Sequence, residues 1–261
     1  MKIISQTFKK NKKLFIPFIT AGDPDLNATE MFVSTLVEAG SDIVELGVPY
    51  SDPIGDGPVN IRSSQRALKS KTSLKSILDF VALLRNRGQN VPIVLFTYFN
   101  PVLQFGLEKF AETAKKNGVD AVLVVDLPPE EAREYSEILG RNEVGTVFLA
   151  SPTTSDKRLK LIDQMSTAFV YYVSRAGVTG VQSELSKTLK LELEHVKSII
   201  KKPLAVGFGI SQREHVQLVS SIADAVVVGS ALVDIIENNL ENVQDCRKKI
   251  SQKVSELAGA L

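Results

Sequence analysis

Short apolar runs rich in Val, Ile and Phe recur along the whole chain, and they are near-continuous rather than alternating. Strands that are buried on both faces have this pattern. Segments with helical spacing of apolar residues lie between the runs, and glycines such as Gly40, Gly88 and Gly118 follow some of them as helix stops. The pattern therefore predicts strands that alternate with helices, with the strands at residues 14–19, 43–46, 93–97, 121–125, 146–150, 169–173, 204–207 and 225–228.

The number of candidate strands indicates the fold class. Eight strands alternating with helices in about 250 residues are typical of a (β/α)8 TIM barrel. The alternative is an open doubly wound sheet, with fewer strands and a glycine-rich fingerprint after the first one. Residues 20–24, which follow the first run, do not fit that fingerprint. We therefore expect α/β architecture in a single (β/α)8 barrel domain over residues 1–261, with extra helices at the N-terminus and in the loops.

Composition and charge narrow the class of protein. A hydrophobic fraction of 44% and a charged fraction of 23% are ordinary for a globular protein, and a net charge of +1 argues against nucleic acid as a partner. The chain has no apolar run of signal-peptide or membrane-spanning length. Cys246, the one cysteine, cannot form an intrachain disulfide. We expect a soluble protein without membrane partners, cytoplasmic or, if encoded in a plastid, in the plastid stroma.

A carboxylate interrupts the second apolar run near its C-terminal end, where barrel enzymes hold their chemistry. A buried charge on Glu45 costs free energy in this position, unless the carboxylate is paired with a cation, is protonated or has a catalytic role. The alternative role is a structural ion pair with a neighbouring strand. No candidate strand contains Lys or Arg, which weakens that alternative, and Glu45 is a candidate catalytic acid or base.

The loop that follows, residues 48–58, contains three prolines and two glycines in eleven residues. It also begins the widest gap between successive candidate strands. Prolines restrict such a loop, whereas Gly55 and Gly57 allow a close approach around Asp56. Asp-Gly is also a common turn dipeptide, and that interpretation stays open. The hypothesis is that Glu45 and Asp56 act as a pair of acids on one substrate.

Glycine-rich turns follow the last three candidate strands. Residues 207–211 and Gly229–Ser230 lie after the seventh and eighth, where barrels bind phosphate through backbone N–H groups and a helix N-terminus. Residues 174–180 follow the sixth, a position typical of a loop that closes over a ligand. The sequence lacks zinc-ligand spacing, G-x-S-x-G and Walker A motifs. It therefore predicts acid–base chemistry on a phosphorylated small molecule, with no metal and no cofactor.

Three blocks, residues 15–24, residues 45–53 with 56–58, and residues 172–180, resemble the tryptophan synthase alpha chain family, and residues 97–101, 126–128 and 207–211 agree. The resemblance covers nearly the whole chain. It implies a TIM-barrel lyase of tryptophan biosynthesis that cleaves indole-3-glycerol phosphate to indole and glyceraldehyde 3-phosphate.

The resemblance also implies roles for individual residues. Glu45 would move protons at indole C3 and at the glycerol hydroxyl, and Asp56 would accept a hydrogen bond from the indole N–H. Tyr171 would lie beside these acids, and Thr179 would lie in the closing loop. The remaining substrate-binding positions would be Phe18, Phe96, Leu123 and Phe208 around the indole, and Gly180, Gly209, Gly229 and Ser230 around the phosphate.

The family further implies a partner. Its alpha chains bind a beta chain that carries pyridoxal phosphate and consumes the indole, so we expect an α2β2 heterotetramer with no cofactor in this chain. Residues 59–62 depart from the usual apolar residue followed by Gln, which bears on local packing and partner contact. Two alternatives are a stand-alone indole-3-glycerol phosphate lyase and a catalytically silent barrel that activates a beta chain. The loops after the second and sixth strands have ordinary sequences for the family, which counts against the stand-alone lyase. The presence of both acids counts against the silent barrel.

Overall fold

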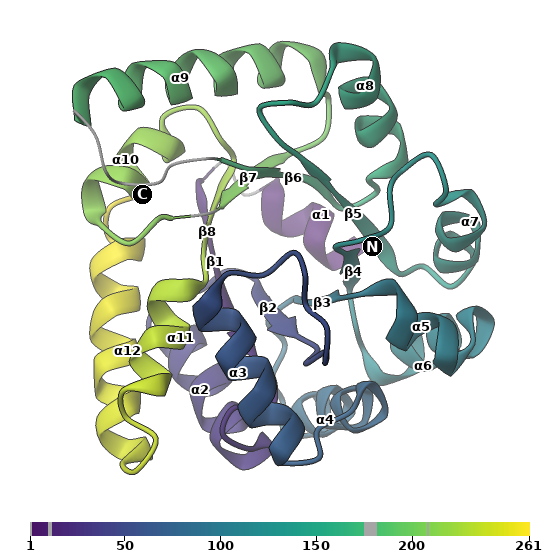
Figure 1. Ribbon diagram of the computed structural model, residues 1–261, viewed down its shortest axis with the longest axis vertical. Coiled ribbons are helices and arrows are strands. Elements are labelled where there is room, and N and C mark those ends of the chain that lie inside the picture. Colours follow the sequence, from purple (N-terminus) through teal and green to yellow (C-terminus); the bar gives the residue numbers. More distant parts are fainter. Residues whose placement is uncertain (1, 10–11, 175–181, 208) are drawn as a thin grey trace.

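A computed structural model describes residues 2–9, 12–174, 182–207 and 209–261. Its strands pair in parallel and in chain order, and β1 pairs with β8 to close a barrel (Figure 1). The prediction of a (β/α)8 barrel is confirmed, and the open-sheet alternative is wrong. The strands are β1 (Leu14–Thr20), β2 (Val44–Gly47), β3 (Ile93–Thr97), β4 (Ala121–Val124), β5 (Gly145–Ala150), β6 (Phe169–Val173), β7 (Leu204–Gly207) and β8 (Ala225–Val228).

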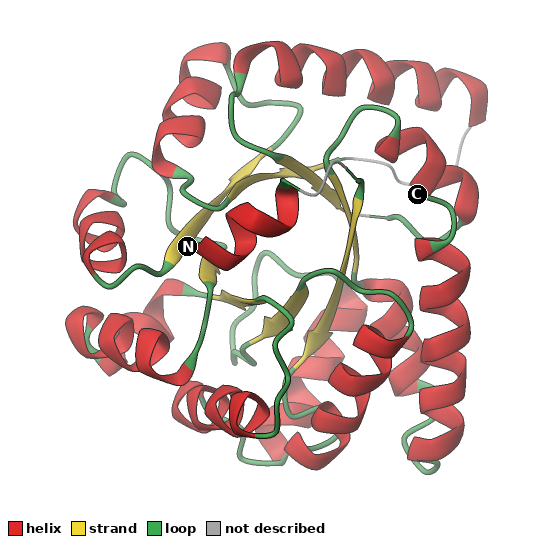
Figure 2. Cartoon of the chain, turned by 180° about the vertical axis from the view of Figure 1, so that it is seen from behind, coloured by secondary structure: helices red, strands yellow, loops and turns green. Residues whose placement is uncertain are grey.

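Helices surround the barrel on all sides (Figure 2). In the described chain, two connections between strands hold two helices each: α3 and α4 lie between β2 and β3, and α5 and α6 lie between β3 and β4. None of the described helices is both long and apolar enough to cross a membrane. The helices are α1 (Lys2–Phe8), α2 (Leu26–Glu38), α3 (Pro58–Lys69), α4 (Leu74–Asn86), α5 (Phe99–Phe105), α6 (Leu107–Asn117), α7 (Arg133–Arg141), α8 (Asp156–Met165), α9 (Gln182–Ile199), α10 (Arg213–Ser220), α11 (Ser230–Glu237) and α12 (Val243–Ala258).

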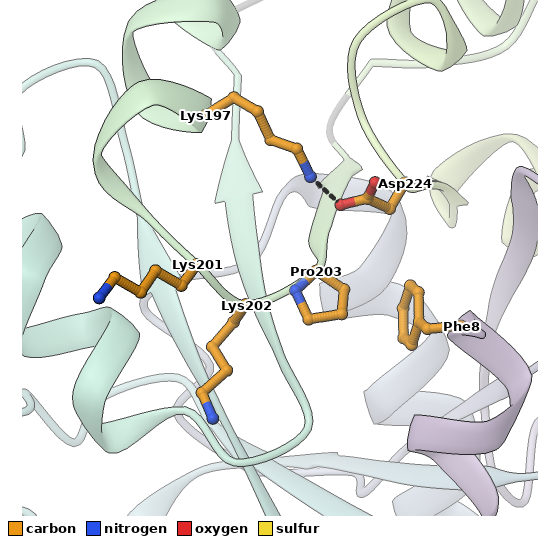
Figure 3. Close-up of a pocket in the computed structure, with 6 residues that line it drawn as sticks. All are labelled: Phe8, Lys197, Lys201, Lys202, Pro203 and Asp224. Atoms are coloured by element: carbon orange, nitrogen blue, oxygen red, sulfur yellow. Dashed lines mark hydrogen bonds and ion pairs between the residues drawn. The ribbon is translucent and has the colours of Figure 1, made fainter. Parts of the chain in front are cut away.

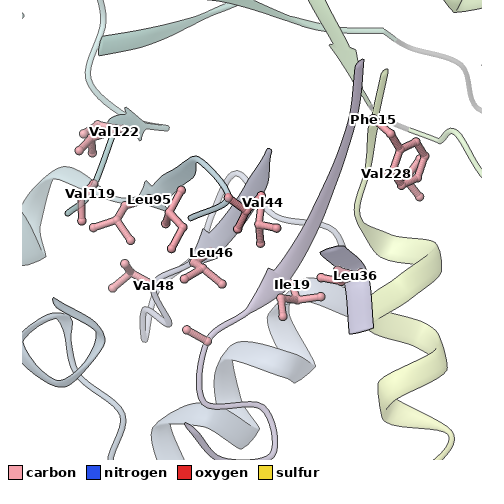
Figure 4. Close-up of a cluster of buried hydrophobic side chains, with 14 of the residues drawn as sticks. Phe15, Ile19, Leu36, Val44, Leu46, Val48, Leu95, Val119, Val122 and Val228 are labelled. Atoms are coloured by element: carbon pink, nitrogen blue, oxygen red, sulfur yellow. The ribbon is translucent and has the colours of Figure 1, made fainter. Parts of the chain in front are cut away.

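The strands are buried on both faces, which explains their near-continuous apolar sequence. Side chains that point outward, such as Val44 and Leu46 of β2, pack with the helix layer, including Leu36 of α2 (Figure 4). Side chains that point inward form a second cluster inside the barrel. Because side chains alternate along a strand, Glu45 between Val44 and Leu46 points into the barrel.

The N-terminal helix α1 covers the end of the barrel at which the strands begin. Ile4 is fully buried among the inward-pointing side chains, and the ring of Phe8 lies 5.7 Å from that of Phe169, the first residue of β6. The opposite end, where the strands finish, carries the loops after β2, β3, β7 and β8. The described candidate site residues lie at that end or inside the barrel.

Candidate active site

Glu45 lies in the middle of the barrel wall, beside Phe18 of β1 and Val94 of β3 in the strand register. Its side chain is fully buried, and neither carboxylate oxygen has a hydrogen-bond partner among the described residues. Burial raises the pKa of Glu45 to about 8, so the group is protonated at neutral pH. The structural ion pair considered as an alternative is therefore not formed with any described residue.

Tyr171 points into the same interior from β6. Burial raises its pKa, and the nearby charge of Glu45 raises it further. The phenol occupies space left by the absent side chain of Gly207 on β7, since a Cβ there would lie 2.3 Å from the Tyr171 hydroxyl oxygen. A tyrosine beside Glu45 agrees with the role that the family resemblance implies.

Apolar side chains surround the carboxyl group. The rings of Phe18 and Phe96 meet edge to face with centroids 5.2 Å apart, and Leu123 is fully buried inside the barrel. Phe18 also lies against Gly229, whose added Cβ would be 3.3 Å from the ring. The structure thus brings three of the predicted indole-contacting residues to one region, and Phe18 connects that region to the turn after β8.

Asp56 lies in the turn between β2 and α3, two residues before Pro58 begins the helix. The hydroxyl of Tyr98 donates to Asp56 Oδ2 at 3.2 Å and accepts the N–H of Gly55 at 3.0 Å. The Tyr98 ring in turn stacks on Tyr50, with centroids 5.0 Å apart. The loop is therefore fastened to the residue that follows β3, and its carboxylate has a fixed donor.

Burial raises the pKa of Asp56, whereas hydrogen bonds from Tyr98 and Asn60 lower it. The N-terminus of α3 adds a positive dipole end next to the carboxylate, which favours the ionised form. Sequence reasoning assigned no role to Tyr98 or Asn60. Tyr98 lies in a block that carries the family resemblance. Asn60 lies in the segment that departs from the family pattern, so this departure affects the pKa of Asp56.

The predicted phosphate site is described in part. Gly209 follows β7 with a φ of +74°, a left-handed conformation that suits glycine. Gly229 precedes the first residue of α11, Ser230, so the N-terminus of this helix lies directly after β8. Thr179, Gly180 and Phe208 lie outside the described residues. The three described positions share the barrel end that holds Asp56.

A pocket of about 220 Å³ lies at the other end of the barrel (Figure 3). Pro203 and Asp224 each precede a strand there, and Asp224 pairs with Lys197. In Figure 3 the amino groups of Lys201 and Lys202 point away from that pair and from one another. The pocket is far along the strands from the two candidate acids and does not belong to their site. Within the described parts of the chain, no group of His, Cys, Asp and Glu could hold a metal ion.

Comparisons with known proteins agree on one family. The family profile described as tryptophan synthase alpha chain matches residues 4–261. The tryptophan synthase alpha chain of Geobacter sulfurreducens is 47% identical over 241 residues, which cover 91% of each chain. Tryptophan synthase subunit alpha of Legionella pneumophila superposes with a TM-score of 0.93 at 36% identity, over 100% of this chain and 98% of that one. A chain of the tryptophan synthase α2β2 complex of Pyrococcus furiosus superposes with a TM-score of 0.88 at 45% identity. The match covers 95% of this chain and 99% of that one.

Proposed function

The chain belongs to the tryptophan synthase alpha chain family and is a lyase for indole-3-glycerol phosphate, and we propose that Glu45 and Asp56 carry the cleavage. The observation that supports this most directly is the buried carboxyl group of Glu45, which forms no hydrogen bond with any residue that the structure describes. Its pKa of about 8 lets it hold a proton at neutral pH and take one back after giving it up. A surface carboxylate could do neither efficiently.

The cleavage requires two proton movements. Glu45 gives its proton to C3 of the indole ring, which becomes a positively charged indolenine. The resulting carboxylate then removes the proton from the hydroxyl on the carbon attached to C3. The bond between that carbon and C3 breaks, its electron pair returns to the ring, and indole and glyceraldehyde 3-phosphate form. Glu45 ends protonated, as it began, so no other acid or base is needed.

Asp56 acts at the other side of the ring. Its carboxylate accepts the indole N–H and stabilises the positive charge that develops when C3 is protonated. Burial raises the pKa of Asp56, and the hydrogen bonds from Tyr98 and Asn60 act against this and favour its ionised form. The two acids thus have different surroundings: no described residue donates to Glu45, whereas Asp56 accepts hydrogen bonds that favour its ionised form.

The substrate is held at both ends. Phe18, Phe96 and Leu123 contact the indole, with Tyr171 beside Glu45. Gly209, Gly229 and Ser230 bind the phosphate through the N-terminus of α11, whose positive dipole end needs no lysine. Phe208, Thr179 and Gly180 complete the two ends by resemblance to the family.

The P. furiosus relative is an α2β2 complex, and we propose that this chain likewise binds a beta chain that consumes the indole. Pyridoxal phosphate belongs to that partner, and no cofactor belongs to this chain. We place the protein in the cytoplasm, or in the plastid stroma if a plastid encodes it. The lone cysteine, Cys246, is buried and free, which suits a reducing compartment.

The test is cleavage of indole-3-glycerol phosphate by the purified chain, followed as glyceraldehyde 3-phosphate release with and without a beta chain. Slow turnover alone that rises sharply with the partner supports an alpha subunit. Fast turnover alone indicates a stand-alone lyase. No turnover in either mixture, with the beta chain still activated, would leave a silent barrel and overturn the proposed roles of the two acids.

A further inference from the structure

Four charged side chains form a chain of ion pairs beside the active-site end of the barrel. Arg66 of α3 donates from Nε and Nη2 to the two oxygens of Asp23, both at 2.8 Å. Its Nη1 donates to Glu237 of α11 at 3.0 Å. Arg62, one turn earlier on α3, donates to both oxygens of Glu237 at 2.6 and 2.8 Å. We call Asp23, Arg62, Arg66 and Glu237 the α3–α11 cluster.

The cluster has a geometry that a loose surface pair lacks. Its two carboxylates and two guanidinium groups balance in charge, and the Asp23 and Arg66 side chains are only 0% and 17% exposed. Two of its contacts are bidentate, which fixes the orientation of each planar group as well as its distance. The relative position of α3 and α11, which lie side by side in Figure 1 and are in contact, is therefore restrained by directional bonds.

The two helices carry opposite ends of the proposed substrate site. Asp56 lies two residues before α3, and Gly229 directly precedes Ser230, the first residue of α11. The cluster is also anchored to the barrel, because Asp23 follows β1 and is buried there. A second contact, between Thr20 of β1 and Ser63 of α3 at 2.6 Å, holds the same helix against the same strand.

We propose that the α3–α11 cluster fixes the distance between Asp56 and the phosphate-binding end of α11 and so selects the length of the linker between an indole ring and a phosphate. This inference rests on the proposed function, which supplies the two ends. Arg62, Arg66 and Glu237 are positioning residues and contact no substrate. A ligand that spans both ends gains affinity from their fixed separation, whereas a ligand that occupies one end does not.

The experiment compares ligands of different reach. Indole and glycerol phosphate each occupy one end, and an indole with a phosphorylated three-carbon chain at C3 spans both. Analogues with two- and four-carbon chains measure the selection of length. Affinities are measured by calorimetry for the wild type, Arg62→Gln and Glu237→Gln. Lys69→Gln is the matched control, because it removes one positive charge from an exposed position on α3.

We expect Arg62→Gln and Glu237→Gln to weaken the three-carbon ligand about threefold to tenfold and to leave both one-ended ligands unchanged. The preference for three carbons over two or four falls in the same variants. In turnover, KM rises more than kcat falls. The double variant loses no more than Glu237→Gln alone, since Arg62 acts through Glu237. Lys69→Gln behaves as the wild type does.

Two results would overturn this inference but leave the proposed function standing. One is an equal loss of affinity for spanning and one-ended ligands in the variants. The other is a wild type that prefers three carbons and two variants that keep the same preference. A wild type that binds none of these ligands would instead overturn the proposed function, and the inference with it. Circular dichroism and thermal unfolding of each variant accompany the titrations. Because Arg62 and Glu237 lie at the exposed side of the cluster, both variants are expected to fold.

Discussion

Replacing Glu45 by Gln should make the protein more stable while it removes most of the cleavage activity. The two side chains have nearly the same shape, and the amide cannot ionise. In the folded protein the carboxyl group has a pKa of about 8, against 4.5 in the unfolded chain. Between these two values the folded protein keeps a proton on Glu45 that the unfolded chain releases. The free energy of unfolding of the wild type therefore falls as the pH rises through this window.

The magnitude follows from the size of the shift. One pKa unit corresponds to 1.36 kcal/mol, so burial of Glu45 costs the wild type about 3 kcal/mol at pH 7 and about 5 kcal/mol above pH 8. Below pH 4.5 both states are protonated and the cost disappears. Glu45→Gln should thus exceed the wild type in stability by these amounts, with a difference that grows with pH. Cleavage should fall by about 10²- to 10⁴-fold, the usual contribution of a general acid–base group.

The assay is urea unfolding of both proteins at pH 5, 7 and 8.5, with indole-3-glycerol phosphate turnover measured on the same samples. Glu131→Gln, at an exposed position of a loop, serves as the control and should change stability by less than about 0.5 kcal/mol. The reasoning fails if the stability difference between Glu45→Gln and the wild type does not change between pH 5 and pH 8.5. Such a result would mean that Glu45 ionises in the folded protein almost as it does in water.

Three further substitutions test the rest of the site. Asp56→Asn should fold normally and lose about 10²-fold in kcat/KM, because the loop keeps its shape and loses the charge that stabilises the indolenine; turnover and circular dichroism check this. Tyr98→Phe removes a hydrogen bond that lowers the pKa of Asp56, so that pKa rises and the acidic limb of the kcat/KM profile should move to higher pH. Gly207→Ala places a Cβ 2.3 Å from the present position of the Tyr171 hydroxyl. It should displace that ring, lower the stability by about 1–3 kcal/mol and lower turnover, as thermal unfolding and kinetics would report.

Each of the three has a result that would contradict it. Full turnover in Asp56→Asn would remove this residue from the mechanism. An unmoved acidic limb in Tyr98→Phe would mean that another group sets it. For Gly207→Ala the matched control is Gly140→Ala, in a helix with open space around the added Cβ; equal effects of the two would show that Tyr171 does not need its present place.

The sequence predicted the barrel closely because both faces of every strand are buried. Each strand therefore appears as a continuous apolar run, and the predicted bounds differ from the observed ones by one residue at most. Glu45 stood out for the same reason, as the one acidic residue within such a run. The structure adds that no residue in the described part of the chain pairs with it.

The remaining features depend on contacts between segments that are distant in the sequence. Tyr98 reaches Asp56 across 42 positions, and Arg66 reaches Glu237 across 171. Neither tyrosine nor arginine has a local pattern that marks it for such a contact. The hydrogen-bond donors to Asp56 and the ion pairs between α3 and α11 could be found only after the strands had been placed.

Closure of the barrel also has a consequence for synthesis of the chain. The first strand to leave the ribosome, β1, pairs with the last, β8, over Leu14 to Pro17. Until residue 228 has been made and has docked, β1 presents an unpaired edge of backbone N–H and C=O groups, and Ile4 has an incomplete interior to bury in. Open edges and exposed apolar surface favour pairing with other copies. The protein is therefore most exposed to aggregation while it is being translated, and a chain that stops before β8 keeps that exposure for good.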